Sequence, residues 1–210
     1  SFKPMQMEFV FGQNGISPIL LELADGTFVY LQGRIDRIDM TTDGAVRIID
    51  YKSGGKKFDP TLVYWGLQLQ LLLYMAAAVA RIPESRAAGF FYCRVADPTV
   101  KTEIRMKEEV EKQIAKKLAL SGITLSDVSI LRAQGGAQAG MVTKDGKPNG
   151  RYASSMVTDE GMEHLIAFAR NKATTLAGDI YAGIIDDSPY ERGSLNACQN
   201  CDYAPICTFD

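Results

Sequence analysis

The 210-residue sequence predicts an α/β fold, in which a mixed β-sheet is flanked by helices and followed by a cysteine-rich C-terminal tail. Three observations predict this class. Strand-like segments joined by hairpin turns come early, a long apolar helix follows them, and an isolated apolar strand comes after that helix. Three antiparallel strands, a crossover helix and a further strand together form a sheet with both parallel and antiparallel pairs.

The first strands lie in the segment PILLELADGTFVYLQGRIDRIDMTTDGAVRIIDYKSG, which reads as three consecutive strands. Asp25-Gly26 and Asp43-Gly44 are typical hairpin turns, because β-branched or aromatic residues flank each of them. The segment therefore predicts a meander in which each strand pairs with the next one along the chain.

The next two elements form the crossover. PTLVYWGLQLQLLLYMAAAVAR is rich in Ala, Leu and Met and is apolar on most of its surface, which predicts one buried helix over residues 60–81. AAGFFYCRVADP then predicts a short buried strand that ends at Asp97-Pro98.

Two helices and a loop are expected after this strand. KEEVEKQIAKKLALSG predicts an amphipathic helix that Gly122 stops. Residues 133–155 are rich in Gly, Ala, Lys and Asn, so we expect a mobile loop or an insertion there. Thr158 is placed to cap a long helix with acidic residues in its first turn, and this helix is expected to reach about Ala182.

The composition is that of a soluble globular protein, with 46% hydrophobic and 23% charged residues. The longest apolar run, from Leu69 to Ala80, contains Gln70 and is too short to span a bilayer, and no signal peptide is visible at the start. A cytoplasmic protein without a membrane partner is expected. The chain opens with Ser-Phe-Lys, which suggests a piece of something longer. Its net charge of −2 means that binding to a polyanion needs a local basic patch, a bound cation or a partner.

A carboxylate and an amine share one face at the end of the third predicted strand. Side chains alternate along a strand, so Asp50 and Lys52 point the same way as Val46 and Ile48, which are expected in the core. Charge at the end of a buried face is costly unless it is paired, solvated or bound to metal. An Asp–Lys ion pair at a strand end is the simplest interpretation.

Asp36 changes that interpretation. Pairing across the turn near Asp43 places Asp36 almost directly opposite Asp50, with Cβ atoms about 5 Å apart, where like charges are destabilising. An ion pair explains Asp50 and Lys52 but leaves Asp36 unexplained. A divalent cation explains all three, and hard oxygen ligands of this kind suit Mg²⁺ or Mn²⁺. Such a site could polarise a phosphoryl oxygen.

The ordered pieces resemble the PD-(D/E)xK nucleases of the RecB type. They are Asp36 on one strand, Asp50-Tyr51-Lys52 on the next, and Gln70-Leu-Leu-Leu-Tyr74 on the following helix. The resemblance runs from about Glu8 to Asp210. It implies a restriction-endonuclease-like βββαβ core over residues 1–190, with the tail at 191–210.

The resemblance implies a metal-dependent DNA exonuclease that hydrolyses phosphodiester bonds in single-stranded ends produced by a helicase partner, in double-strand break repair. Asp36, Asp50 and the backbone carbonyl of Tyr51 would hold Mg²⁺ or Mn²⁺. Lys52, Gln70 and Tyr74 would complete the catalytic set. Two alternatives stay open: a Cas4-like nuclease, and a non-catalytic DNA-binding module of the same fold.

Three tail cysteines, Cys198, Cys201 and Cys207, are spaced closely enough to bind metal. They are one thiolate short of a Cys₄ iron–sulfur site. The remaining cysteine, Cys93, lies in an apolar strand and is expected to be a small core residue between Phe91 and Val95. The resemblance implies a [4Fe–4S] cluster whose fourth ligand lies far upstream of the nuclease core, so the cluster is expected to be incomplete in this chain. A zinc site or free thiols are the alternatives.

Four further residues have weaker interpretations. His164 is expected on the solvated side of the late helix, and Glu8 is a candidate outer metal ligand. Tyr64 and Trp65 could stack on bases, but packing at the start of the helix is the favoured role for both. The tail is expected to be held by its own packing, through Tyr203, Pro205, Ile206 and Phe209.

Overall fold

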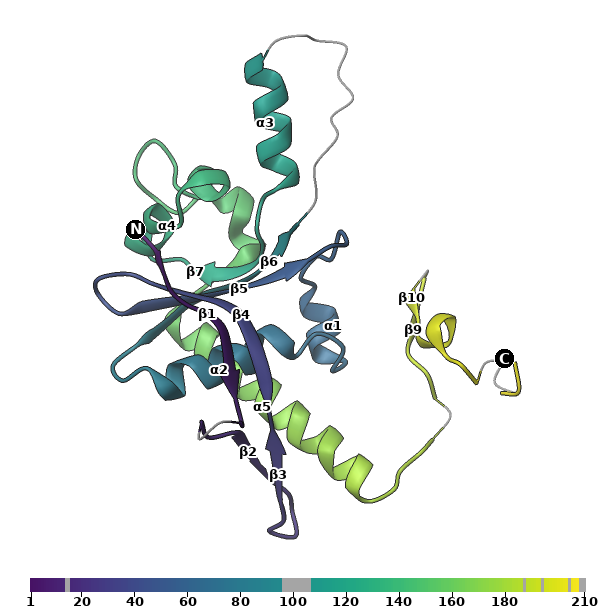
Figure 1. The fold of residues 1–210 in the computed structure, drawn as a ribbon. Coiled ribbons are helices and arrows are strands. Elements are labelled where there is room, and N and C mark those ends of the chain that lie inside the picture. Colours follow the sequence, from purple (N-terminus) through teal and green to yellow (C-terminus); the bar gives the residue numbers. More distant parts are fainter. Residues whose placement is uncertain (14–15, 96–106, 187, 194, 204, 208–210) are drawn as a thin grey trace.

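The computed structural model describes residues 1–13, 16–95, 107–186, 188–193, 195–203 and 205–207. Its centre is a six-stranded mixed sheet of order β1-β4-β5-β6-β7-β8 (Figure 1). The pairs β5–β6 and β7–β8 are parallel and the other three pairs are antiparallel. The strands of this sheet are β1 (Lys3–Phe11), β4 (Gly33–Met40), β5 (Ala45–Lys52), β6 (Arg86–Arg94), β7 (Ser121–Leu125) and β8 (Met156–Val157).

Helices cover both faces of the sheet. The α helices are α1 (Pro60–Tyr64), α2 (Gln70–Arg81), α3 (Lys107–Lys117), α4 (Val128–Gln134) and α5 (Asp159–Tyr181). Helix α2 packs on β5 and β6 and is itself contacted by α5, while α4 contacts β7. The main core lies between the sheet and α2, where Ile48, Leu72 and Phe90 are fully buried. No helix among the described residues is long and apolar enough to cross a membrane.

The predicted mixed sheet with a βββαβ core is confirmed, but its first strand is not the predicted one. The antiparallel trio is β1, β4 and β5, and α2 then crosses over to β6, which is parallel to β5. The Asp25-Gly26 turn does form a hairpin, from β2 (Ile19–Glu22) and β3 (Phe28–Leu31), but the two strands make a separate sheet. Strand β1 shows little alternation, with six exposed residues at its start, and was not predicted.

The predicted helix over 60–81 is interrupted, which is a correction. Helix α1 ends at Tyr64 and α2 begins only at Gln70. Gly66 lies between them with φ of +85°, a left-handed conformation that ends a helix and that glycine adopts at little cost. Buried Gln68 then ties the connection together, because its amide accepts from Asp59 N and donates to Lys57 O.

Gly122 does not stop a helix as predicted. Helix α3 ends at Lys117, and Gly122 lies within β7, opposite Phe91 of β6. A Cβ at Gly122 would lie 1.9 Å from the carbonyl oxygen of Phe90, so only glycine allows this approach of the two strands. The structure does require glycine at position 122, but the reason is the close contact between two strand backbones and not the end of a helix.

The later elements partly match the predictions. Residues 133–155 are not one irregular loop, because 3-10 helices form at Gly136–Met141 and Gly150–Ser155. Thr158 caps α5 as predicted, its hydroxyl accepting from Gly161 N, and Ala182 is the C-cap. The predicted Asp97-Pro98 strand end lies outside the described residues.

The tail contains a two-stranded piece, β9 (Glu191–Arg192) with β10 (Leu195–Asn196), and a 3-10 helix at Ala197–Asn200. Arg192 of the tail lies with its Nη1 3.5 Å from Asp59 Oδ2, and just before the tail the ring of Tyr190 packs against Trp65 with ring centroids 5.8 Å apart. Tyr203 and Ile206 are 71% and 80% exposed, and Pro205 is exposed as well, so the predicted packing of the tail on itself is wrong for these three residues. Phe209 lies outside the described residues.

A cluster of charge on the second face of the sheet was not predicted from the sequence. Asp39 is fully buried and accepts from Arg37 Nε at 2.6 Å and from Arg47 Nε at 2.8 Å. Arg47 also donates to the Gln134 side chain of α4, and this amide donates to Thr124. We call Arg37, Asp39 and Arg47 the buried arginine network; it links β4 and β5 to α4.

Replacing Asp127 by alanine should lower the unfolding free energy at pH 7 by about 1 kcal/mol, because its carboxylate caps α4 through Ser129 N. Hydrogen bonds from Ser129 first, and then from Arg86, lower the pKa of Asp127 to about 2. A depressed acid pKa stabilises the fold above the usual value of 3.8, and that contribution is lost as the pH falls from 3.8 through 2. Denaturant titrations of both proteins should therefore converge over that range; a gap that stays constant contradicts the assignment.

Candidate active site

The two predicted carboxylates meet where β4 and β5 separate. The β4–β5 ladder runs from Met40↔Val46 to Arg37↔Ile49, the register that brings Asp36 opposite Asp50, as predicted. Beyond this ladder a side chain, and not the β4 backbone, accepts the hydrogen bond from β5: Tyr51 N donates to Asp36 Oδ2 at 2.8 Å. The carboxylate thus fixes the residue that separates Asp50 from Lys52.

Asp50 lies at the buried end of this site. It is 2% exposed, and burial raises the pKa of its carboxyl group, with the charge of Asp36 acting in the same direction and Lys52 opposing it. Lys52 Nζ lies 2.6 Å from Asp50 Oδ2 and forms an ion pair with it. A carboxylate offers about four lone-pair sites, so the Asp50 side chain can accept a further cation or donor beside Lys52.

Lys52 connects the carboxylates to α2. Its ammonium also donates to Gln70 Oε1 at 3.4 Å, and Gln70 Nε2 donates to the Tyr74 hydroxyl at 3.0 Å. Gln70 and Tyr74 are one helical turn apart on the same face of α2, as predicted from their spacing. The Tyr74 ring is fixed edge-on against Phe11 of β1, with centroids 5.9 Å apart. All five predicted catalytic residues therefore lie on the α2 side of the sheet, around the end of β5.

Two residues of this region were not predicted from the sequence. Tyr92 of β6 pairs with Asp50 in the parallel register, and Lys56 follows Gly54-Gly55 in the chain. Lys56 Nζ lies 5.0 Å and Lys52 Nζ 5.7 Å from the centroid of the Tyr92 ring. Tyr92 has the apolar sequence neighbours of a core residue, so nothing in the sequence marked it as a site residue. The Lys56-Lys57 pair, which follows the Asp-x-Lys motif closely, could have been recognised as a basic patch.

The tail cysteines are not gathered around a common point. Cys198 is half-buried, Cys201 and Cys207 are exposed, and no group of three or more metal-ligating His, Cys, Asp or Glu side chains occurs among the described residues. Cys93 lies on β6 as predicted, but it is only half-buried, and burial raises the pKa of its thiol. Its neighbour Phe91 is buried, whereas Val95 is 59% exposed, which corrects the expectation that both pack in the core.

The weaker candidates have clear positions. His164 is exposed on α5, as expected. The carboxylate of Glu8 pairs with Arg34 Nε at 3.0 Å, and both side chains are mostly exposed. Tyr64 stacks on Phe168 of α5 with an interplanar angle of 12° and makes a T-shaped contact with the ring of Trp65. These contacts support a packing role, although Tyr64 and Trp65 remain more than half exposed.

A mixed sheet with two carboxylates and a lysine at the end of its central strands is typical of one class of nuclease, and sequence comparison identifies the same class. The profile of the PD-(D/E)XK nuclease superfamily matches residues 1–208, and the chain belongs to this superfamily. It is 38% identical over 227 residues to one of the subunits of the ATP-dependent helicase/deoxyribonuclease of Alkaliphilus metalliredigens. The proteins of the same name from Clostridium tetani and Clostridium botulinum are 39% identical over 226 and 37% over 228 residues. Each alignment covers 100% of this chain and 20% of the relative, so the chain spans one fifth of these relatives.

Proposed function

We propose that this chain is a DNA nuclease domain that hydrolyses phosphodiester bonds with the help of Mg²⁺ or Mn²⁺. One observation carries the proposal: the buried carboxylate of Asp50 lies opposite a second carboxylate, Asp36, with the ammonium of Lys52 only 2.6 Å from Asp50. If this face served only for packing, an apolar residue in place of the buried acid would make the fold more stable. The match to a nuclease superfamily supports the same conclusion.

The donor set fits a hard divalent cation. Asp36 and Asp50 offer carboxylate oxygens, and the carbonyl of Tyr51 lies between Asp50 and Lys52 in the chain, so these three residues are the proposed ligands. In the described structure the ammonium of Lys52 supplies positive charge at Asp50. A bound cation would neutralise both carboxylates and polarise a phosphoryl oxygen.

The remaining residues have proposed roles in positioning and charge. Lys52 is held between Asp50 and Gln70, which places a fixed positive charge beside the carboxylates, where charge develops on the phosphate during hydrolysis. Gln70 and Tyr74 orient that ammonium and offer polar groups to the DNA. Because these side chains are held by one another and by α2, little reorganisation is needed during the reaction.

Replacing Lys52 by methionine should lower the cleavage rate by about 10²-fold or more while leaving the fold intact, because one preorganised charge is removed. The measurement is the Mn²⁺-dependent release of fluorescent fragments from single-stranded and linear duplex DNA, with circular dichroism as a check of the fold. The Asp145→Asn variant, which changes the charge at an exposed turn, is the surface control. If Lys52→Met cuts at the wild-type rate, the active site lies elsewhere.

The biological setting follows from the names of the relatives and remains a proposal. We infer an exonuclease acting on single-stranded ends within an AddAB-type helicase–nuclease of double-strand break repair, with this chain as part of AddB and an AddA-type helicase as its partner. A cytoplasmic location is part of the same proposal. So is the division into a nuclease core over 1–190 and a tail over 191–210.

A [4Fe–4S] cluster is proposed for the tail of the intact protein. Cys198, Cys201 and Cys207 would supply three thiolates, and a fourth ligand from outside these 210 residues would complete the set. The three thiols are accessible enough for this, because two are exposed and one is half-buried. The assignment is tested by iron analysis and visible absorbance of the intact protein purified without oxygen.

A further inference from the structure

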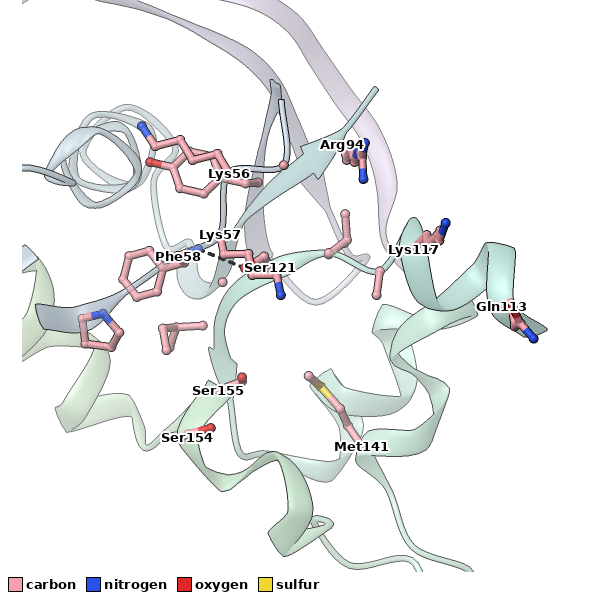
Figure 2. Close-up of a pocket in the computed structure, with 17 residues that line it drawn as sticks. Lys56, Lys57, Phe58, Arg94, Gln113, Lys117, Ser121, Met141, Ser154 and Ser155 are labelled. Atoms are coloured by element: carbon pink, nitrogen blue, oxygen red, sulfur yellow. Dashed lines mark hydrogen bonds between the residues drawn. The ribbon is translucent and has the colours of Figure 1, made fainter. Parts of the chain in front are cut away.

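A large open cleft lies next to the candidate active site, with a volume of about 1060 Å³. Figure 2 shows its walls: the segment with Lys56, Lys57 and Phe58 on one side, Ser154 and Ser155 on another, and α3 with Lys117 at the far end. The basic residues that line it are Lys56, Lys57, Arg94 and Lys117. None of its 17 described lining residues is acidic.

This charge is local. The chain as a whole carries a net charge of −2, so four basic side chains without an acidic one concentrate the positive potential in this cleft. Phe58 and Ile123 line the cleft with apolar surface, which has a low dielectric constant and therefore strengthens the electric field of the basic side chains. The ligand that such a groove fits is a linear polyanion.

Tyr92 marks the end of the cleft that is next to Asp50. Its side chain lines the cleft, but the residue is only 2% exposed, and its hydroxyl has no hydrogen-bond partner among the described residues. A phenol is protonated at neutral pH, so this hydroxyl can donate a hydrogen bond. Buried hydroxyl groups are normally paired. The missing partner here is an acceptor, and the ammonium groups of Lys52 and Lys56 near the ring favour an anionic one.

We propose that the Tyr92 hydroxyl and the Lys56 ammonium form a phosphate subsite for the nucleotide next to the scissile phosphate. The cleft beyond it, along Lys57, Arg94 and Lys117, binds the backbone of a single DNA strand. This inference rests on the proposed nuclease function. It adds two substrate-contacting residues and a direction for the strand, from Asp50 towards α3.

The cleft is suited to bind the phosphates of the DNA strand and not its bases. Its two aromatic lining residues offer no stacking platform, because Tyr92 is buried and Phe58 is half-buried with its ring against Phe90, 5.2 Å between centroids. Binding should therefore be sensitive to salt and tolerant of sequence.

The test compares variants of the intact natural protein by fluorescence anisotropy. The probe is 5′-fluorescein-labelled oligo-dT of graded length, in EDTA so that no cleavage occurs, over a series of NaCl concentrations. Lys56→Gln and Lys117→Gln should each lower the slope of log K against log salt by about 0.7, because each removes one phosphate contact. Tyr92→Phe should weaken binding about 10-fold without changing the slope, since it removes a neutral donor to a charged group. Lys3→Gln is the control, because Lys3 is exposed and pairs with Met40, at the end of β4 away from Asp36.

Oligonucleotide length separates the two parts of the site. The effects of Tyr92→Phe and Lys56→Gln should persist with the shortest oligonucleotide that binds, whereas that of Lys117→Gln should appear only with longer ones. Wild-type affinity in both Tyr92→Phe and Lys56→Gln overturns the subsite. Since Lys56 is exposed, its variant keeps the test valid even if Tyr92→Phe folds poorly.

A parallel cleavage assay with Mn²⁺ distinguishes this inference from the proposed function. Cleavage by the wild type with unchanged binding in the variants means that the subsite is wrong and the nuclease assignment stands. Weakened binding in the variants without cleavage by the wild type removes the nuclease assignment, and with it the place of the subsite beside a scissile phosphate, but supports Tyr92 and Lys56 as phosphate contacts.

Discussion

The Asp50→Asn variant is expected to lose cleavage by roughly 10³-fold or more, because it removes the buried carboxylate on which both the proposed cation and Lys52 depend. Asparagine has the same shape, so the core around β5 should remain packed. Binding of Mn²⁺ should be lost together with activity, since one of two carboxylate ligands becomes a weak neutral one.

The same variant should be at least as stable as the wild type at pH 7 without metal. Burial raises the pKa of Asp50 above the usual 3.8, so the ionised carboxylate costs stability in the folded state. With a raised acid pKa, the wild type binds more protons when folded, and its stability falls as the pH rises from 3.8 through the raised value. The advantage of Asp50→Asn should therefore be greatest at neutral pH and should vanish in acid.

Three measurements check this result: cleavage of labelled DNA, Mn²⁺ binding by electron paramagnetic resonance, and denaturant unfolding in EDTA between pH 3.5 and pH 8, a window chosen to span the usual carboxyl pKa. Asp145→Asn again serves as the exposed control. Full activity in Asp50→Asn contradicts the proposed site. A marked loss of stability with retained metal binding makes Asp50 a structural residue.

The candidate site was largely predictable from sequence because its pieces obey short-range rules. The turn at Asp43-Gly44 sets the register that brings Asp36 opposite Asp50, and the strand period puts Lys52 on the same face. The four-residue spacing puts Gln70 and Tyr74 on one side of α2. What such rules do not give is which strand lies on the other side of β5, and that neighbour, β6, supplies Tyr92.

The errors in the fold have a common physical cause, which is that tertiary contacts override local patterns. The β2–β3 hairpin has good turn chemistry, yet β1 takes its place beside β4 although its first six residues are exposed. Helix α2 does not continue from α1 because Gly66 and Gln68 organise the connection between them. Gly122 signals contact between strands, and only a structure shows what lies opposite a glycine.

The second large effect is expected at Asp39 and concerns stability. The Asp39→Asn variant should lose about 3–5 kcal/mol of unfolding free energy, because removing one partner of a buried ion pair leaves uncompensated charge. Asp39 is fully buried and its carboxylate accepts from both Arg37 and Arg47, whose own side chains are largely buried. Two guanidinium groups would then face each other across β4 and β5 with no counter-charge between them.

A surface ion pair on the neighbouring strands is the control. Glu8 and Arg34 make a contact at 3.0 Å, with side chains 59% and 66% exposed, so Glu8→Gln should change stability by less than about 1 kcal/mol. Urea unfolding of the two variants and the wild type at pH 7 gives the comparison directly. Equal losses in Asp39→Asn and Glu8→Gln would mean that the buried arginine network is not what holds α4 against the sheet. A loss confined to Asp39→Asn, with Asp50→Asn stable and inactive, separates the carboxylate that maintains the fold from the carboxylate that serves the chemistry.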